Sequence, residues 1–438
     1  MTELFRPAMS RRRFLSTSAL AIAGGSTVLA GCGSGSSGGP GASSKGAVTW
    51  ASWANPGEAI RFKEYSKSYE QSSGAKITYQ TVVGDYQAKL LSQLAGAAAP
   101  DAFYVGDGQM AKLVGSKQLV DLTSYLNAAD SPVKEADFFP GLMQWCRPKG
   151  GEGLYGVPVD CNPKVFWFNS DVLAKAGVTQ TPAQMFEAGT WTQDALTSLL
   201  DKVRATGKRG MVLEAGWFDL MSWITTFGGT AIDTDGKAVF DTDPKAQTAV
   251  AWLFDQLASG NITFGGSLPK GQGADALFYS GQLATIQYGR WILPNLKKLK
   301  FGYDIAPLPS ESGKDIMPVP VATAAMSVNV KAKNQEAALA FLGNYVSSEG
   351  QKFRLSGGGN ACPSVNGLDE LVTEGNLPAH GKLFTEIARK GYAIPLAIAG
   401  NAEVATNLPL LMDRLLKAGK ETPLSFSQKL VQLINGTK

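Results

Sequence analysis

The sequence predicts an α/β fold, because patterns typical of strands and helices alternate along much of the chain. From Ala47 onward, short apolar runs alternate with longer segments whose apolar residues recur at helical spacing. Repeated strand–helix units favour a mostly parallel sheet with helices packed on it. The length of 438 residues is enough for two or three domains with a large core. We therefore expect an α/β protein with more than one domain.

The expected elements follow a regular order in the first third of the chain and a less regular order afterwards. Strands are predicted at 47–50, 76–82, 102–105, 153–159, 165–168 and 283–286. Helices are predicted at 57–71, 85–98, 109–114, 171–176, 192–205, 220–226, 244–259, 336–346 and 408–418. Pro100 follows the second of these helices and ends it, because proline has no amide hydrogen to continue a helix.

The N-terminal segment has the three parts of a secretory signal. Three arginines at 11–13 precede an apolar run at 19–30, and small residues follow before a cleavage point. The arginine pair followed by Phe14-Leu15 matches the twin-arginine (Tat) export pattern. The apolar run is shorter than the roughly 20 residues that a membrane span needs. We expect residues 1–31 to be a signal peptide that is removed after export.

A lipid attachment site is expected directly after this signal. Leu29-Ala30-Gly31-Cys32 resembles a bacterial lipobox, which implies a diacylglyceryl thioether with palmitate-like acyl chains on Cys32. Two acyl chains hold a protein stably at a membrane, whereas one chain does not. Residues 32–45 are mostly Gly, Ser, Pro and Ala, a composition typical of a flexible tether. The expected location is the extracytoplasmic face of the cell membrane.

The charge of the chain argues against a nucleic-acid partner. The formal net charge is +4, and the expected signal carries four arginines and one glutamate. The remainder of the chain is therefore close to neutral, and no basic face is implied. The only histidine, His380, excludes a histidine-based metal site. Beyond Cys32 there are three cysteines, so at least one thiol stays free if the others pair.

Short motifs suggest where a ligand could bind. Gly106-Asp107-Gly108 begins a G-x-G-x-x-A dinucleotide pattern, but an exported protein meets little NAD, so a ligand loop at the end of a strand is preferred. Tyr288-Gly289-Arg290-Trp291 offers an indole face and an arginine fork, which suit a sugar ring or an anion. A core tryptophan beside a surface arginine is the alternative. Asp160-Cys161-Asn162-Pro163 interrupts two strands with polar groups, as a crossing between lobes often does.

A series of segments runs through the chain from about residue 47 to about residue 433 in a recognisable order. They are Val48-Thr49-Trp50, Ala99-Pro100-Asp101-Ala102-Phe103, Gly115-Ser116-Lys117-Gln118-Leu119-Val120-Asp121-Leu122, Tyr155-Gly156-Val157-Pro158, Phe168-Asn169-Ser170-Asp171, Ala176-Gly177, Trp191, Tyr279-Ser280-Gly281-Gln282-Leu283-Ala284, Gly289-Arg290-Trp291, Ile305-Ala306-Pro307-Leu308-Pro309 and Glu336-Ala337-Ala338-Leu339-Ala340-Phe341-Leu342. In this order they resemble the carbohydrate-uptake family of extracellular solute-binding proteins, the maltose-binding-like receptors of ABC importers.

The resemblance implies a two-lobed, periplasmic-binding-protein-like (type II) α/β fold with the ligand cleft between the lobes. Such receptors close around the ligand by a hinge. The lobes of this family are discontinuous in sequence. Lobe one would comprise 46–160 and 322–360, and lobe two would comprise 161–321 and 361–438.

The resemblance also implies a set of ligand-binding residues. These are Trp53, Asn55, Glu58, Asp107, Asp160, Asn162, Trp217, Tyr288, Arg290, Trp291 and Thr323. The residue types suit a sugar, because carboxylates, amides and arginine pair with hydroxyls, and flat rings cover the C–H faces. Cys161 and Cys362 would both lie near lobe crossings, so we hypothesise a disulfide between them that restrains the hinge. The rival pair is Cys146 and Cys161.

The function implied by the resemblance is that of a binding protein without catalytic residues, cofactor or metal. We expect a monomer that captures a mono-, di- or oligosaccharide and delivers it to ABC permease and ATPase subunits. One alternative is a receptor for a glycerophosphodiester, served by Arg290, or for an amino sugar, served by Glu58, Asp107 and Asp160. An alternative of another class is a secreted glycan-degrading enzyme that uses two carboxylates.

Overall fold

The computed structural model describes residues 46–54, 56–82 and 84–437. The expected signal peptide (1–31), Cys32, the tether (32–45) and Asn55 lie outside the described residues. Within the described part, no helix has the length and apolar character that crossing a bilayer requires.

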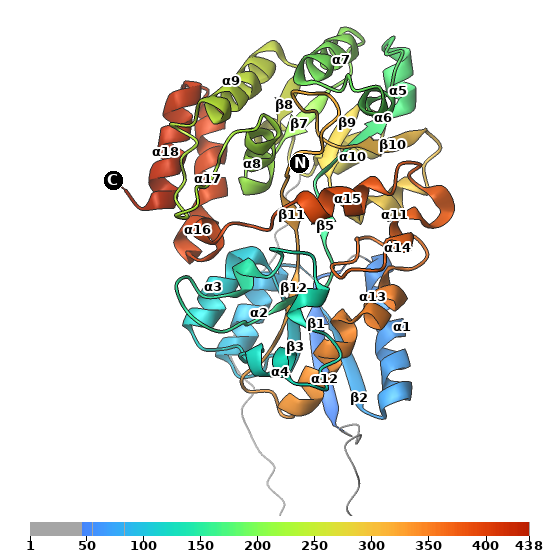
Figure 1. The fold of residues 1–438 in the computed structure, drawn as a ribbon, viewed down its shortest axis with the longest axis vertical. Coiled ribbons are helices and arrows are strands. Elements are labelled where there is room, and N and C mark those ends of the chain that lie inside the picture. Colours follow the sequence, from blue (N-terminus) through green and yellow to red (C-terminus); the bar gives the residue numbers. More distant parts are fainter. Residues whose placement is uncertain (1–45, 55, 83, 438) are drawn as a thin grey trace, which may run out of the picture. The chain divides into compact units, whose positions relative to one another are not determined.

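One sheet has five strands in the order β2-β1-β3-β12-β4 and forms the centre of lobe one (Figure 1). Its strands are β1 (Ala47–Ser52), β2 (Lys76–Thr81), β3 (Ala102–Val105), β4 (Val157–Pro158) and β12 (Ala325–Val328). β1 is parallel to β2 and β3, whereas β12 is antiparallel to β3 and β4. The prediction of a mostly parallel sheet is therefore correct only for β1–β3. Those three strands are joined by strand–helix units, but the chain reaches β12 on its return from the other lobe.

The helices of lobe one pack on this sheet and bury an aromatic core. α1 contacts β2, and α12 contacts β1 and β12. Trp50 on β1 is fully buried, contacts Phe62 and Tyr345, and donates from Nε1 to Ser66 Oγ at 3.0 Å. The helical segments of this lobe are α1 (Pro56–Ser73), α2 (Tyr86–Ala95), α3 (Asp107–Gly115), α4 (Thr123–Asn127), η1 (Glu135–Asp137), η2 (Gln144–Cys146), α12 (Gln335–Val346) and α13 (Ser348–Leu355).

Lobe two contains an antiparallel sheet in the order β10-β6-β9 and a parallel pair, β7-β8. The strands are β6 (Val165–Asn169), β7 (Met211–Leu213), β8 (Ile262–Phe264), β9 (Thr285–Tyr288) and β10 (Tyr303–Ala306). The helical segments are α5 (Ser170–Lys175), α6 (Pro182–Glu187), α7 (Gln193–Ala205), α8 (Trp217–Thr226), α9 (Pro244–Ser259), η3 (Gly265–Ser267), α10 (Ala274–Tyr279), η4 (Arg290–Ile292), α11 (Leu293–Leu296), α14 (Glu370–Thr373), η5 (Glu374–Asn376), α15 (Leu383–Lys390), α16 (Leu396–Ala399), α17 (Ala402–Ala418) and α18 (Pro423–Asn435).

Local capping explains which helix ends could be read from the sequence. α9 begins after Asp243, whose side chain accepts from the Ala246 amide, and ends at Gly260 in the left-handed conformation. Its bounds match the predicted 244–259. α17 starts six residues before the predicted 408, because Asn401 caps it and Pro409 is accommodated inside the helix. A proline inside a helix removes one backbone hydrogen bond, yet α17 continues through Pro409.

The chain crosses between the lobes in segments that pair with one another. β5 (Asn162–Pro163) is antiparallel to β11 (Val321–Ala322), and Cys161 forms an isolated antiparallel bridge with Cys362. Figure 1 shows β5 and β11 between the two groups of sheets. The thiols of Cys146, Cys161 and Cys362 are free in the structure, so neither expected disulfide pairing is present in it.

One segment expected in lobe two contacts lobe one instead. Ser364 donates from its amide to Gln351 Oε1 at 2.8 Å, and its carbonyl accepts from the Phe139 amide at 2.8 Å. The Asn366 amide donates to the Asp137 carbonyl at 2.8 Å. The last crossing therefore extends beyond residue 361, where the sequence placed the start of the second part of lobe two.

Candidate functional site

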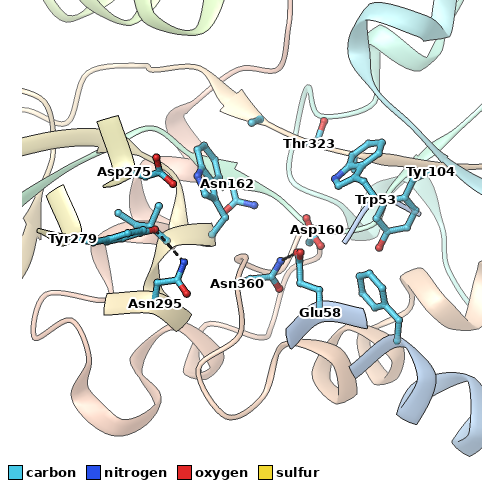
Figure 2. Close-up of a pocket in the computed structure, with 15 residues that line it drawn as sticks. Trp53, Glu58, Tyr104, Asp160, Asn162, Asp275, Tyr279, Asn295, Thr323 and Asn360 are labelled. Carbon is cyan, nitrogen blue, oxygen red and sulfur yellow. Dashed lines mark hydrogen bonds between the residues drawn. The ribbon is translucent and has the colours of Figure 1, made fainter. Parts of the chain in front are cut away.

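A cavity of about 470 Å³ lies between the two lobes, next to the crossing segments. It is lined by Trp53, Glu58, Phe62, Tyr104, Asp160, Asn162, Asp275, Tyr279, Trp291, Ile292, Asn295, Ala322, Thr323, Ala324 and Asn360. Figure 2 shows Asp275, Tyr279 and Asn295 on one side, Trp53, Tyr104 and Glu58 on the other, and Asp160 between them. We refer to this cavity as the cleft. Its volume is within the range usual for small-molecule sites.

The lobe-one wall of the cleft lies where parallel strands end. Trp53 follows β1, and Tyr104 lies in β3 next to it in the sheet. The Trp53 ring makes edge-to-face contacts with Tyr104 and Tyr86, each at a centroid distance of 5.3 Å. Glu58, in the first turn of α1, accepts a hydrogen bond from the Asn360 amide. Carboxyl ends of parallel strands are the usual place for ligands in open α/β sheets.

The floor of the cleft is made by the crossing segments. Asn162 in β5 accepts from the Arg290 amide at 2.8 Å, which fixes the orientation of its side chain. Thr323 follows β11, and its hydroxyl accepts from Trp145 Nε1 at 2.9 Å. Both polar side chains are therefore held in place by protein contacts before any ligand arrives. Such preorganisation lowers the entropic cost of binding.

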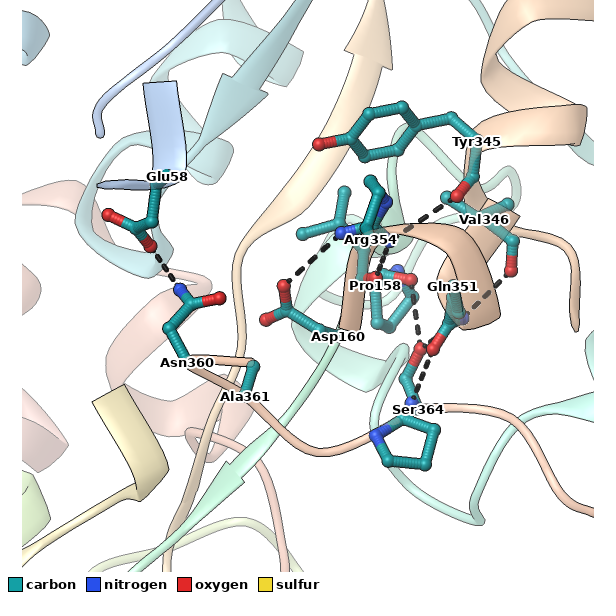
Figure 3. A network of polar contacts seen from close by, with 12 residues as sticks. Glu58, Pro158, Asp160, Tyr345, Val346, Gln351, Arg354, Asn360, Ala361 and Ser364 are labelled. Carbon is teal, nitrogen blue, oxygen red and sulfur yellow. Dashed lines mark hydrogen bonds and ion pairs between the residues drawn. The ribbon is translucent and has the colours of Figure 1, made fainter. Parts of the chain in front are cut away.

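Asp160 on the floor belongs to a buried polar network (Figure 3). Arg354 Nη1 lies 3.6 Å from Asp160 Oδ2, and its guanidinium lies 4.0 Å from the centre of the Tyr345 ring. The hydroxyls of Tyr345 and Tyr104 are 2.6 Å apart. Burial raises the pKa of Asp160 to about 6, although the Arg354 charge acts in the opposite direction. The network thus pairs the carboxylate of Asp160, which lines the cleft, with the almost fully buried guanidinium of Arg354.

The lobe-two wall includes short helices and the partly buried indole of Trp291. Asp275 and Tyr279 lie on α10, and Asn295 on α11 donates to the Tyr279 hydroxyl at 3.4 Å. Trp291, in η4, lines both the cleft and a neighbouring cavity of about 270 Å³. That second cavity includes Tyr288, whose hydroxyl donates to a carboxylate oxygen of Glu214 at 2.5 Å. Trp291 therefore borders both the cleft and the adjoining cavity in lobe two.

The structure places six of the sequence-predicted residues in the cleft. These are Trp53, Glu58, Asp160, Asn162, Trp291 and Thr323. Tyr288 lies in the neighbouring cavity. Asp107 and Trp217 contact each other, because Trp217 Nε1 donates to Asp107 Oδ2 at 3.3 Å across the two lobes. Burial raises the pKa of Asp107, and its main partners are this indole and the Gly108 amide. Asn55 lies outside the described residues.

The interpretation of Arg290 as a ligand-binding fork is corrected by its placement. Its side chain is fully buried, and it donates to the carbonyls of Ala361 at 2.8 Å and Leu371 at 3.0 Å. Arg290 therefore holds the last crossing segment against lobe two. Its neighbour Trp291 faces the cleft, because successive residues of a 3₁₀-helix point about 120° apart.

Several cleft residues were missed by the sequence reasoning. Asp275, Tyr279, Asn295 and Asn360 were not among the candidates, nor was Tyr104. A signal existed for the first two, because the glycine-rich stretch at 265–273 ends directly before α10 and marks a loop that could border a ligand. Nothing in the local pattern around Asn295 or Asn360 distinguishes these residues from surface amides.

Comparison with known proteins identifies a family. The model of the bacterial extracellular solute-binding protein family matches residues 51–352. YcjN of Escherichia coli strain K12, whose name describes it as an ABC transporter periplasmic-binding protein, is 25% identical over 249 residues. That match covers 55% of this chain and 54% of YcjN, so the chain spans about half the length of this curated relative.

Solved structures share the fold at low sequence identity. The substrate-binding protein Lmo0181 of Listeria monocytogenes, in complex with cycloalternan, has a TM-score of 0.75 at 20% identity, covering 90% of this chain and 100% of its own. The GacH receptor of Streptomyces glaucescens has a TM-score of 0.73 at 19% identity, with 90% and 100% covered. Maltose-bound MalE3 of T. maritima has a TM-score of 0.71 at 17% identity, with 89% and 99% covered. The two-lobed fold predicted from the sequence is confirmed.

Proposed function

The chain belongs to the family of bacterial extracellular solute-binding proteins, and on that premise we propose that it is the sugar receptor of an ABC importer. It captures a mono-, di- or oligosaccharide between its lobes and delivers it to a membrane permease. The family acts outside the cytoplasm. The ligand class, the importer subunits and the absence of catalysis are parts of the proposal.

The observation that carries this proposal is the composition of the cleft. Trp53 of lobe one and Trp291 of lobe two both line the cleft, and so do hydrogen-bonding side chains such as Asp160, Asn162 and Asn295. A sugar ring has apolar C–H faces and a rim of hydroxyls that both donate and accept hydrogen bonds. Aromatic faces and side-chain amides or carboxylates match these two features. The fold relatives named above are described with cycloalternan, acarbose and maltose, which supports the same ligand class.

The lobes and the anchor complete the proposal. In this proposal lobe one comprises residues 46–160 and 322–360. Lobe two comprises the remaining described residues, of which Ser364 and Asn366 also form hydrogen bonds to lobe one. The receptor is a monomer tethered to the outer face of the membrane through a lipid on Cys32, after Tat export and removal of residues 1–31. In this proposal residues 32–45, whose Gly- and Ser-rich composition is typical of linkers, connect the lipid to the two lobes.

An amino sugar is the second candidate ligand, and the charge of the cleft favours it over a glycerophosphodiester. Among the described residues that line the cleft, Glu58, Asp160 and Asp275 are acidic and none is Lys, Arg or His. Carboxylates stabilise a nearby ammonium group and repel a phosphate. Arg290, the residue that could have served a phosphate, is turned to backbone carbonyls instead.

A thermal-shift screen of sugars tests the proposal directly. A ligand at 100 times its Kd stabilises the folded protein by about 2.7 kcal/mol, so the thermal midpoint should rise by about 3–5 °C. The screen should contain neutral mono-, di- and oligosaccharides, glucosamine, and glycerophosphocholine. A shift with glucosamine and none with neutral sugars would select the second candidate. Release of products from any glycan incubated with the protein would overturn the receptor function.

Ligand affinity should depend on pH through Asp160. Its raised pKa, about 6, means that the carboxylate takes up a proton as the pH falls from 7.5 to 5.0. Protonation removes an ionised acceptor for a sugar hydroxyl, so Kd should rise by about tenfold over that range. Isothermal titration at both pH values measures this change. Asp160→Asn should bind weakly with the same Kd at both pH values, and an unchanged wild-type Kd would contradict the role of Asp160.

A further inference from the structure

One of the three carboxylates that line the cleft has no partner within the described part of the chain. Glu58 accepts a hydrogen bond from Asn360, and Asp160 pairs with Arg354. Asp275 also lines the cleft, but it forms neither a hydrogen bond nor an ion pair with any described residue. The residue is partly buried, and an ionised group in such a place gains stability by accepting hydrogen bonds. The acceptor capacity of Asp275 is therefore available to a molecule that enters the cleft.

The first turn of α10 places this carboxylate on the lobe-two wall. Asp275 and Tyr279 are four residues apart on α10, so they lie on the same face of the helix, and both line the cleft (Figure 2). The residue before the helix is Gly273, and a Cβ atom there would lie only 2.7 Å from Asp275 Oδ1. Glycine at this position therefore leaves room for the carboxylate. Trp291 lines the same cavity, so a flat ring and a carboxylate are available together on lobe two.

The charges around Asp275 are mostly negative. None of the described residues that line the cleft is Lys, Arg or His. Burial raises the pKa of Glu214 in the adjoining cavity, and the charge of Asp275 raises it further. Lys164, the cation that acts on Glu214 in the opposite direction, is already paired with Asp219. This wall therefore favours a ligand that brings hydrogen-bond donors or positive charge, and it disfavours an anion.

We propose that Asp275 is the lobe-two residue that determines ligand specificity, by accepting hydrogen bonds from donor groups of the bound sugar. This role rests on the proposed function, because it requires a sugar in the cleft. An ionised carboxylate has two acceptor oxygens and no donor, so it accepts from two donors at once. Two adjacent hydroxyls of a neutral sugar, or the ammonium group of an amino sugar, supply such donors. A ligand that offers only acceptors at this position is rejected.

A purely structural role for Asp275 makes a different prediction. An acidic residue in the first turn stabilises a helix through the helix dipole, wherever in the protein that helix lies. Asp194 occupies the same position in α7, the second helical residue, but it is exposed and does not line the cleft. Asp194→Asn is therefore a matched control for Asp275→Asn, since each variant removes one charge from the first turn of a lobe-two helix.

Isothermal titration of the exported chain with the best neutral sugar from the thermal screen, and with glucosamine, tests this role. Asp275→Asn should raise the Kd by at least about tenfold, because a hydrogen bond to an ionised acceptor is lost. Asp275→Ala should raise the Kd further, because the asparagine amide keeps one acceptor oxygen. Asp194→Asn should leave the Kd unchanged. The thermal midpoints of the ligand-free Asp275→Asn and Asp194→Asn proteins should differ from that of the wild type by similar, small amounts.

The two ligands also identify the donor that Asp275 receives. A loss of affinity for the neutral sugar assigns hydroxyls, whereas a larger loss for glucosamine that becomes smaller at high salt assigns the ammonium group. An unchanged Kd in Asp275→Asn, or an equal rise in Asp194→Asn, would overturn the role of Asp275 while leaving the receptor function intact. A wild type that binds none of the sugars would overturn the proposed function, and the role of Asp275 with it.

Discussion

Replacing Arg354 with alanine is expected to lower the free energy of unfolding by about 3–5 kcal/mol. The Arg354 side chain is nearly inaccessible and lies 3.6 Å from the carboxylate of Asp160, whose side chain is 14% exposed. It also donates to the carbonyls of Val159 and Tyr345 and covers the Tyr345 ring. Its removal leaves Asp160 without a counter-charge and two carbonyls without a donor. Urea denaturation followed by tryptophan fluorescence measures the loss.

Two further variants separate the ion pair from the loss of side-chain volume. Arg389→Ala is the matched control, because Arg389 pairs with Asp369 at 2.5 Å while both side chains are more than a third exposed. Exposed pairs contribute about 0–1 kcal/mol, so this variant should change little. Adding Asp160→Asn to Arg354→Ala should recover part of the loss, because no charge is then left buried alone. Equal losses in Arg354→Ala and Arg389→Ala would contradict the role of the network.

The Arg354 network has a consequence for binding as well as for stability. A carboxylate that faced the cleft without a buried cation behind it would take up a proton more readily, because burial alone disfavours its charge. Arg354 lowers the pKa of Asp160 against this effect. The cation therefore favours the ionised form of Asp160, whose oxygens could then accept hydrogen bonds from the hydroxyls of the proposed sugar ligand. The ion pair between Arg354 of lobe one and Asp160 at the first crossing thus influences the charge of the cleft floor.

Much of the fold could be predicted because its signals are local. β3 is a four-residue buried run at the predicted positions, and α9 has an aspartate cap and a terminal glycine. The direction of β12 could not be predicted in this way. Strand direction depends on where the chain comes from in space, and β12 is entered from the crossing near Val321 rather than from a helix on the same sheet.

The candidate site shows the same division between local and long-range information. Trp53, Asp160 and Trp291 lie at strand ends or crossings, so their place in the order of elements brings them to the cleft. Arg290 and Trp291 are adjacent in sequence, and only the turn of η4 determines which of them faces the cleft. Asn360 lines the cleft because the last crossing passes beside α1. Its side chain there contacts Glu58, which is about 300 positions earlier in the sequence. No pattern within a short window carries that information.

Replacing Trp291 with alanine is expected to raise the Kd for the sugar by about 30-fold. Its ring borders both the cleft and the adjoining cavity, and it contacts Tyr288 and Phe218 at centroid distances of 5.4 and 6.2 Å. These neighbours hold the indole, so its face is available to a ligand without further ordering. Loss of a central aromatic contact typically costs about 2 kcal/mol of binding free energy, which corresponds to that ratio. Isothermal titration with the best sugar from the thermal screen gives the Kd.

The matched control is Trp252→Ala, which removes an indole of the same lobe from a packed position away from the cleft. Trp252 lies on α9 against Trp223 and Phe227, at centroid distances of 5.0 and 5.6 Å. Its loss should lower the thermal midpoint while leaving the Kd of the folded protein unchanged, since the ring makes no part of the cleft. Trp291→Phe should give an intermediate Kd, because a smaller flat face remains. If Trp291→Ala bound as tightly as the wild type, the ligand would have to lie elsewhere in the cleft, against Trp53 and Tyr104 on lobe one.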